Sequence, residues 1–354
     1  MIERLGWRPV FAEAFAPFGE AGLIPARVAV EHRAHFVVYT ADGECRATLA
    51  GRFLSEAETL DRPAIGDWVG LRSAGDGRGV IEAVLPRHCA FTRKRAGRTS
   101  TAQVVAANID TVFVVTAIGR DLSARRIERY LALAWESGAR PVIVINKADL
   151  EEDPNETDLL LEEAGVAAPT HRVSALTRDG VDALERYLAP GCTVALLGSS
   201  GVGKSTLVNA LTGEERQRVS EIRADGKGRH TTTHRELVPL PRGGFLIDTP
   251  GMRELALLES DEGLTAAFPE VAALADGCRF RDCTHAEEPG CAVIAAVNAG
   301  ELSEERLESY RKLVSESRHA AARTDERLQG QRRRRERVLA RALNERLRSK
   351  YGKR

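Results

Sequence analysis

The sequence predicts a multidomain chain, with a β-barrel at the N-terminus, an α/β domain in the centre and a helical, metal-binding domain at the C-terminus. Three observations predict this order. Short alternating apolar runs recur between residues 27 and 91, strand-like and helix-like patterns alternate from residue 109, and three cysteines crowd between residues 278 and 291. A chain of 354 residues is long enough for about two to three domains, each with its own core.

Composition and charge argue against a membrane protein. No apolar run approaches the roughly 20 residues that cross a bilayer, and the first residues lack the apolar segment of a signal peptide. We therefore expect a cytoplasmic protein, a monomer without a membrane partner. The net charge is zero because a basic tail balances an acidic remainder: residues 330–354 hold 11 Lys and Arg against Glu336 and Glu345.

The N-terminal region, residues 1–91, has the pattern of a small barrel. Turn signals such as Asp42-Gly43 separate five short runs with strand character, at residues 27–30, 35–40, 46–53, 67–72 and 79–85. Five short strands favour an OB-type β-barrel, a fold that often binds RNA. A barrel with a purely structural role explains the pattern too.

Residues 92–108 interrupt this pattern with basic residues among Gly, Thr and Ser, namely Arg93, Lys94, Arg95 and Arg98. We interpret the segment as a basic linker. It is either a solvated hinge or a contact to phosphate groups.

The central region, residues 109–257, alternates strands and helices. Strands are predicted at residues 111–117, 141–145, 171–173 and 193–197, and helices at residues 123–137, 158–164 and 181–188. This alternation predicts a parallel sheet covered by helices.

The strand at residues 193–197 leads into a phosphate-binding P-loop. Glycines at its turns let consecutive backbone N–H groups surround an anion. Lys204 would carry charge to the β and γ phosphates, Ser205 would offer its hydroxyl to Mg²⁺, and the helix from Lys204 directs its positive end at the ligand. The predicted loop consists of Gly198, Ser199, Ser200, Gly201, Val202, Gly203, Lys204, Ser205 and Thr206.

A second motif, Asn146-Lys147-Ala148-Asp149, follows the strand at residues 141–145 at the edge where α/β sheets bind ligands. The Asp149 carboxylate would accept two hydrogen bonds from guanine, which adenine does not offer. Lys147 would lie over the base, and Asn146 would tie the loops together. After the next strand, Ser174 and Ala175 suit the backbone loop that contacts the base carbonyl.

Two further segments have the composition of nucleotide switches. One threonine of residues 231–233, assigned here to Thr232, would reach Mg²⁺. A strand pair at residues 235–239 and 244–247 then leads to Asp248-Thr249-Pro250-Gly251. Asp248 would hold Mg²⁺ through water, and the Gly251 N–H would meet the γ-phosphate.

These elements indicate a GTPase whose motif order is permuted. The base-reading motif at Asn146 precedes the P-loop, whereas it follows the Asp-x-x-Gly turn in conventional GTPases. We conclude that the domain is circularly permuted. The region after Gly251 is therefore joined almost directly to the second switch.

The C-terminal region, residues 258–322, contains four candidate metal ligands at short spacing: Cys278, Cys283, His285 and Cys291. Three thiolates and an imidazole suit one closed, structural Zn²⁺ site. Free core cysteines are the alternative, but the charged neighbours Arg279, Arg281 and Asp282 do not suit an apolar core. Helices are predicted at residues 292–298 and 302–317.

Together these motifs resemble the circularly permuted, ribosome small subunit dependent GTPase family of bacteria, RsgA or YjeQ. Pro63 to Val69 and Asn108-Ile109-Asp110 are also similar to its pattern, from about residue 20 to about residue 320. The resemblance implies an OB domain, a GTPase, a zinc domain, and binding to the small ribosomal subunit and its rRNA during late maturation. It does not extend to the basic tail, residues 323–354, which either contacts RNA or is merely solvated.

The resemblance also implies a catalytic role for His230. Met252 stands where Ras-like enzymes carry the glutamine that orients water, so intrinsic hydrolysis is expected to be slow. His230 matches the histidine proposed for the family, with His234 and a ribosomal group as rivals. Lys204 would stabilise the transition-state charge. Two other functions stay open: a GTP-gated RNA-binding module with incidental hydrolysis, and a metal-handling GTPase that does not act on ribosomes.

Overall fold

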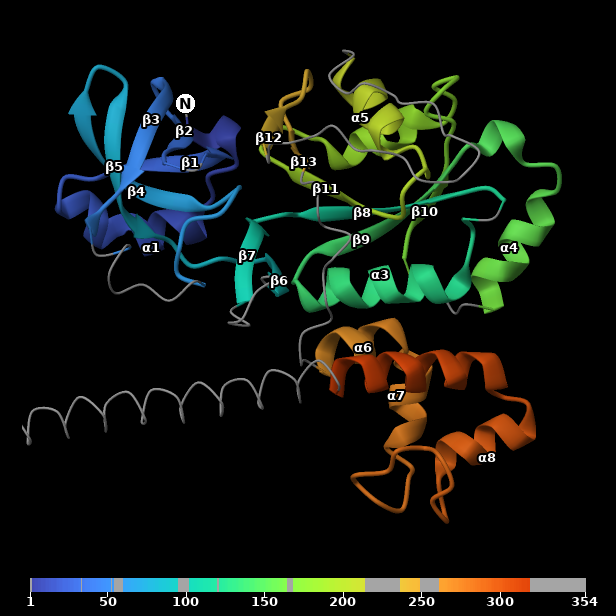
Figure 1. The fold of residues 1–354 in the computed structure, drawn as a ribbon. Helices are drawn as coiled ribbons and strands as arrows, with labels where there is room; N and C mark the ends of the chain where they lie inside the picture. The colour runs from blue at the N-terminus through green and yellow to red at the C-terminus, as the bar shows by residue number, and fades with distance from the viewer. Residues whose placement is uncertain are drawn as a thin grey trace, which may run out of the picture.

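The computed structural model describes residues 2–32, 34–51, 53, 60–94, 102–119, 121–163, 168–213, 236–248 and 261–318. Five strands form the N-terminal barrel in the order β1-β2-β3-β5-β4, and β4 pairs back with β1, so that the barrel is closed (Figure 1). β3 and β5 run parallel, while the other neighbours are antiparallel. This confirms the predicted five-stranded barrel. Its strands are β1 (Ile24–Glu31), β2 (Phe36–Thr40), β3 (Gly43–Leu49), β4 (Trp68–Gly75) and β5 (Arg78–Val84).

The barrel closes around small and β-branched side chains contributed by alternate positions of its strands. Those with no exposed surface include Val28, Val38, Ala47, Val69 and Ile81. A helix that the sequence pattern did not predict, α1 (Pro9–Glu20), lies against the barrel. It begins with a proline, which suits a first helical turn, and packs Phe11 onto Trp68 with ring centres 5.8 Å apart.

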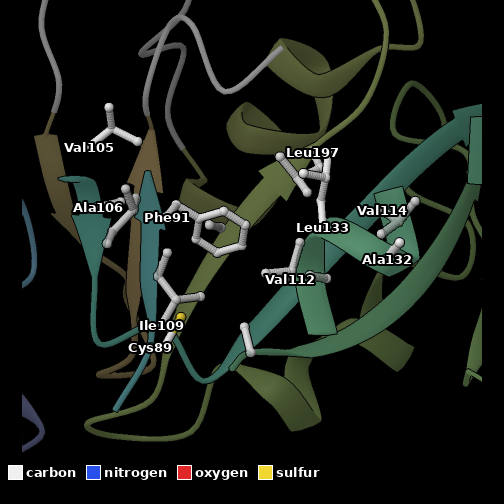
Figure 2. Close-up of a cluster of buried hydrophobic side chains, with 14 of the residues drawn as sticks. Cys89, Phe91, Val105, Ala106, Ile109, Val112, Val114, Ala132, Leu133 and Leu197 are labelled. Atoms are coloured by element: carbon white, nitrogen blue, oxygen red, sulfur yellow. The ribbon is translucent and has the colours of Figure 1, made fainter. Parts of the chain in front are cut away.

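A two-stranded hairpin connects the barrel to the central domain. β6 (Ala90–Lys94) pairs antiparallel with β7 (Ala102–Ala107), so both ends of the predicted basic linker have regular structure. The reason is burial: Phe91, Val105 and Ala106 belong to the same core as Val112 and Leu133 of the central domain (Figure 2). The basic positions Arg95 and Arg98 lie outside the described residues.

The central domain is a sheet in the order β10-β9-β8-β11-β13-β12, parallel except for its last strand. The predicted strand pattern is confirmed, and β12 also pairs with β1 of the barrel through Val30 and Glu236. The strands are β8 (Thr111–Ala117), β9 (Arg140–Asn146), β10 (Thr170–Arg172), β11 (Thr193–Leu197), β12 (Glu236–Pro239) and β13 (Phe245–Asp248).

Helices cover both faces of this sheet (Figure 1). On one face, α3 (Ala124–Glu136) packs Ile127 and Leu131 against Val112 and Val114. On the other face, the 3-10 helix η3 (Val181–Tyr187) and α5 (Lys204–Thr212) pack onto the opposite side chains of the same strands, such as Val115. α4 (Pro154–Glu163) completes the domain. Strands buried on both faces explain the almost continuous apolar runs in this part of the sequence.

The C-terminal domain packs onto α3 (Figure 1). It contains α6 (Asp261–Ala267), α7 (Pro269–Ala275), α8 (Ala292–Ala299) and a helix over residues 304–318. α6 approaches α3 so closely at Gly263 that an added Cβ would lie 2.6 Å from the Ala132 carbonyl oxygen.

A buried ion pair joins this domain to α3. The Arg306 guanidinium lies 2.7 Å from the Glu128 carboxylate of α3, and both side chains are 3% exposed. Arg306 also pairs with Glu270 at 2.6 Å and lies over the Phe268 ring. Because an isolated charge is costly to bury, each side chain of this pair depends on its partner in the other domain.

The barrel is joined to the central domain by another buried arginine. Arg27 of β1 donates hydrogen bonds to the Thr193 hydroxyl at 2.7 Å and to the Asn108 carbonyl at 3.3 Å. Burial lowers the pKa of Arg27 to about 10, so it stays charged at neutral pH. Gly66 lies at the same junction, where an added Cβ would lie 2.2 Å from the Ala107 carbonyl oxygen. Gly66 belongs to the Pro63 to Val69 segment identified in the sequence, and this close approach explains why the segment contains a glycine.

Candidate nucleotide and metal sites

The P-loop follows β11 and curves around the start of α5. Gly198 has a φ of +153°, and a Cβ there would lie 2.2 Å from the Val115 carbonyl oxygen of the neighbouring strand. Gly203 precedes the helix with a φ of +91°, and a Cβ there would lie 2.2 Å from the side-chain amide nitrogen of Asn146. Both positions therefore require glycine, for conformation and for close approach.

The Lys204 ammonium lies against this loop. It donates hydrogen bonds to the carbonyl oxygens of Gly198, at 2.8 Å, and Ser199, at 2.5 Å. The positive charge is thus held at the N-terminus of α5, where the helix dipole also favours an anion. Ser205 and Thr206 follow in the first turn and are partly exposed. This end of α5 has the charge and geometry to bind phosphate groups.

Asn146 connects the two predicted nucleotide loops. Its side-chain amide donates to the Val202 carbonyl at 2.8 Å, and its side-chain oxygen accepts from the Ala175 N–H at 2.9 Å. The residue is 2% exposed. The structure therefore brings together the P-loop, the end of β9 and the loop after β10, as the sequence predicts for Asn146.

The remaining base-reading positions surround Asn146 at the carboxyl edge of the sheet. Lys147 has a left-handed φ of +61°, which turns the chain into the short 3-10 helix η2 (Ala148–Leu150). The Ala148 N–H donates to the Val173 carbonyl at 3.1 Å, and Asp149 is exposed. Ser174 is buried and accepts from the Thr177 N–H. Lys147, Asp149, Ser174 and Ala175 therefore lie at one edge with Asn146.

Arg178 attaches the loop after β10 to α5, a role that the sequence analysis did not predict. It has a φ of +72° and donates to the Ala210 carbonyl at 2.8 Å, which satisfies a carbonyl near the C-terminal end of α5. The loop after β10 is therefore attached near both ends of α5, through Arg178 at the C-terminal end and through Asn146 at the P-loop. The turn sequence Arg178-Asp179-Gly180 was the available signal.

Of the predicted switch residues, only Asp248 is in the described part of the chain, and only its backbone. It ends β13, whose Ile247 pairs with Ala195 of β11, so it lies one strand away from the P-loop. His230, Thr232, His234, Gly251 and Met252 lie outside the described residues, as does the basic tail from residue 323.

The four predicted metal ligands come together as one cluster. The candidate ligand atoms of Cys278, Cys283, His285 and Cys291 all lie within 4.8 Å of one another. The Cys278 and Cys291 Sγ atoms are 3.8 Å apart, and His285 Nδ1 lies 3.6 Å and 3.5 Å from them. Ligands at zinc bond lengths and a tetrahedral angle would be about 3.8 Å apart for two sulfurs and about 3.6 Å for sulfur and nitrogen. The donor set and its spacing fit zinc.

A network of hydrogen bonds shapes the loop that carries these ligands. The Glu288 carboxylate accepts from the N–H groups of Thr284 and Ala286, each at 2.8 Å, and from the Thr284 hydroxyl. The hydrogen bond from the Thr284 side chain is the main reason why the pKa of Glu288 falls to about 2. Arg311 of the C-terminal helix donates to the His285 carbonyl, which fastens the loop to the rest of the domain.

Comparison with known proteins agrees with this geometry. The family model described as RsgA GTPase matches residues 84–258. A model described as ABC transporter matches residues 181–346, a stretch that includes the P-loop, which many nucleotide-binding families share. Within the described part of the chain, none of the helices combines the length and apolar character of a membrane span.

Individual relatives match over almost the whole chain. The small ribosomal subunit biogenesis GTPase RsgA of Opitutus terrae is 49% identical, over 99% of this chain and 96% of its own. The crystal structure of YjeQ from Thermotoga maritima has a TM-score of 0.64 and 31% identity, covering 83% of this chain and 98% of its own. The structure of YloQ, described as a circularly permuted GTPase, has a TM-score of 0.62 at 22% identity, covering 84% and 96%.

Proposed function

The chain belongs to the RsgA GTPase family and is a circularly permuted GTPase, and we propose that it hydrolyses GTP in response to the small ribosomal subunit and assists or checks late subunit maturation. The observation that carries this proposal is the 49% identity to a small ribosomal subunit biogenesis GTPase, over 99% of one chain and 96% of the other. Identity of that extent covers the barrel, the GTPase and the metal-binding domain together. A protein with this role acts in the cytoplasm, and we propose that it acts as a monomer.

The nucleotide is assigned to the edge of the sheet where the P-loop and the Asn146 loop meet. Residues 198–206 would hold the phosphates, with Lys204 supplying positive charge and the Ser205 hydroxyl facing Mg²⁺. Asp149 would accept hydrogen bonds from guanine, Lys147 would cover the base, and Ser174 with Ala175 would line its carbonyl side. The Asn146 hydrogen bonds to Val202 and Ala175 support this assignment, because they bring the phosphate and base loops together.

Hydrolysis is assigned to a switch-dependent step. Thr232 and Asp248 would complete the Mg²⁺ shell, and the Gly251 N–H would meet the γ-phosphate. Because Met252 cannot orient water, His230 would do so when the small subunit is bound. Lys204 and the backbone N–H groups of the P-loop would stabilise the developing charge.

The metal cluster is assigned to one structural Zn²⁺. Cys278, Cys283, His285 and Cys291 would supply all four tetrahedral positions, which leaves none for a reacting water. A closed site of this kind does not suit exchange of its metal. We therefore favour a role in holding the C-terminal domain over metal delivery.

The barrel and the C-terminal domain are the surfaces proposed to bind ribosomal RNA. Each is joined to the GTPase by a buried arginine, the barrel through Arg27 and the C-terminal domain through Arg306. Contacts made by either domain would therefore be transmitted to the nucleotide site. This arrangement supports stimulation of hydrolysis by a bound subunit.

GTP turnover with and without purified small subunits tests the proposal. We expect slow turnover by the free protein and a large increase with subunits, on the order of 100-fold or more, that His230→Ala removes without loss of GTP binding. His234→Ala is the matched control and should keep the stimulation. Equal turnover with and without subunits would contradict the proposed function and favour a GTP-gated binding module.

A further inference from the structure

An exposed aromatic side chain between two metal ligands carries the further inference. Phe280 is 42% exposed, while every other described Phe, Tyr and Trp is at least partly buried. It lies in the segment between Cys278 and Cys283, which belong to the metal cluster. An aromatic ring exposed in this way is accessible to a ligand, and its cover by that ligand would contribute free energy of burial.

Two arginines are adjacent to Phe280 in the sequence. Arg279 and Arg281 are both exposed, and the Arg279 guanidinium lies over the Phe280 ring, 5.5 Å from its centre. Within the described part of the chain neither arginine forms an ion pair. Asp282 is the one acidic residue of the segment, so two cations stand against one anion.

Two backbone hydrogen bonds shape this segment, one that holds it to Gly290 and one that closes a turn within it. The Arg279 N–H donates to the Gly290 carbonyl at 3.1 Å, and the Cys283 N–H donates to the Phe280 carbonyl at 3.3 Å. Gly290 leaves room for Arg279, whose Cβ would lie 3.1 Å from an added Cβ. Little conformational freedom would therefore be lost when a ligand binds to this segment.

An exposed ring beside two arginines has the chemistry that recognises unpaired RNA. A base would stack on the ring face that Arg279 leaves open, and the guanidinium groups would contact the neighbouring phosphates. Duplex RNA offers phosphates but keeps its bases stacked inside, so it would not occupy the ring. An acidic protein surface would also pair with the two arginines, but it has no base to stack on the ring, and the proposed partner is RNA.

We infer that Arg279, Phe280 and Arg281 form a binding site for one unpaired RNA base and its flanking phosphates. This inference rests on the proposed function for its partner class and identifies where on the C-terminal domain that partner is bound. The metal ligands on either side set the position of the segment. The site is thus a small stacking platform presented by the metal-binding loop.

The test uses the full chain and a short single-stranded RNA with a central 2-aminopurine, whose fluorescence is quenched by stacking. We expect Phe280→Ala and Phe280→Leu to weaken binding about tenfold and to reduce the quench, whereas Phe280→Trp keeps both. Leu159→Ala, an exposed apolar residue of α4, is the control and should bind as the parent does. Phe280→Leu separates stacking from simple apolar cover of the metal loop.

The arginines have a different signature. Arg279→Gln and Arg281→Gln should each lower the slope of log affinity against log salt by about 0.7, while Phe280→Leu leaves the slope unchanged. Arg125→Gln, an exposed arginine of α3, is the matched control. Metal content measured on every variant confirms that the loop is intact.

Three results would each overturn the inference. The first is that the parent does not quench the probe, and the second is that Phe280→Leu binds and quenches as the parent does. The third is that Phe280→Leu loses as much affinity for a duplex of the same length as for the single strand. These outcomes are independent of the GTPase assay. If small subunits stimulate hydrolysis but Phe280→Leu binds RNA normally, the inference alone is wrong. If subunits do not stimulate hydrolysis, the proposed function is contradicted whatever the RNA result.

Discussion

The side-chain amide of Asn146 donates a hydrogen bond to the Val202 carbonyl at 2.8 Å, and a Cβ at position 203 would lie 2.2 Å from the nitrogen of that amide. Through this contact the end of β9 supports the P-loop directly. The other side of the amide accepts the Ala175 N–H, so one buried residue orients three loops. Phosphate binding and base recognition are therefore expected to depend on each other.

Asn146→Ala should weaken GTP binding at least tenfold. The substitution removes two buried hydrogen bonds and leaves the Val202 carbonyl and the Ala175 N–H without these partners. Isothermal titration with GTP measures the effect. Asn155→Ala, at an exposed asparagine of α4, is the matched control and should bind as the parent does. GTP affinity within twofold of the parent would show that Asn146 does not organise the site.

Asp149→Asn should shift base preference from guanine to xanthine. The carboxylate offers two acceptors, whereas the amide offers one acceptor and one donor. Competition between GTP and xanthosine triphosphate for the variant measures this preference. Asp153→Asn, an exposed aspartate just before α4, serves as the control. A variant that retains full preference for GTP would remove Asp149 from the base site.

Arg306→Met should destabilise the contact between α3 and the C-terminal domain by roughly 3 kcal/mol or more, because Glu128 would be left buried without its cation. The double variant Arg306→Met with Glu128→Met should recover much of that loss. Chemical unfolding followed by the fluorescence of Trp135 in α3, with the other tryptophans replaced, measures the difference. Arg125→Met breaks an exposed pair with Glu308 and should cost about 1 kcal/mol or less. Equal costs for the two arginines would contradict a special role for Arg306.

Removal of the metal should unfold the C-terminal domain while the GTPase remains folded. A closed zinc site contributes its binding free energy to folding, and the four ligands here come from one loop region. Cys283→Ala should have the effect of a chelator, whereas Cys192→Ala should retain the metal. Metal analysis and limited proteolysis of residues 261–318 provide the measurement. Full proteolytic resistance of the metal-free protein would argue against a structural metal.

Thermal stability should fall as the pH is lowered from 7 to 5, in part through His88. Burial lowers the pKa of His88 below its ordinary 6.5, next to Asp110 at 3.7 Å. Because the folded state favours the neutral ring, stability is present above the unfolded pKa and declines as the pH falls below 6.5. His88→Asn should therefore reduce the decline in the unfolding midpoint. An identical pH profile for His88→Asn would exclude this histidine as a cause.

The local pattern of apolar, polar and turn residues in the sequence determines much of the architecture. The strands at residues 111–117 and 193–197 have the predicted bounds, and the five barrel strands lie where alternation and turn residues indicate. These elements are predictable because their periodicity reports which face is buried. Motif spacing likewise identified the P-loop, the Asn146 motif and the four metal ligands, since each is contained in a short stretch of chain. The order of those motifs also indicated the permutation.

Contacts between distant segments could be decided only by the tertiary structure. No local pattern distinguishes Arg27 or Arg306 in the sequence, yet each is buried at a domain junction by a partner far away in the chain, Thr193 or Glu128. The basic residues of the β6–β7 hairpin predict an exposed linker. Its apolar residues are nevertheless buried, because they pack in one core with Val112 and Leu133. Burial is a property of how the three domains pack, and a single stretch of sequence does not contain its own neighbours.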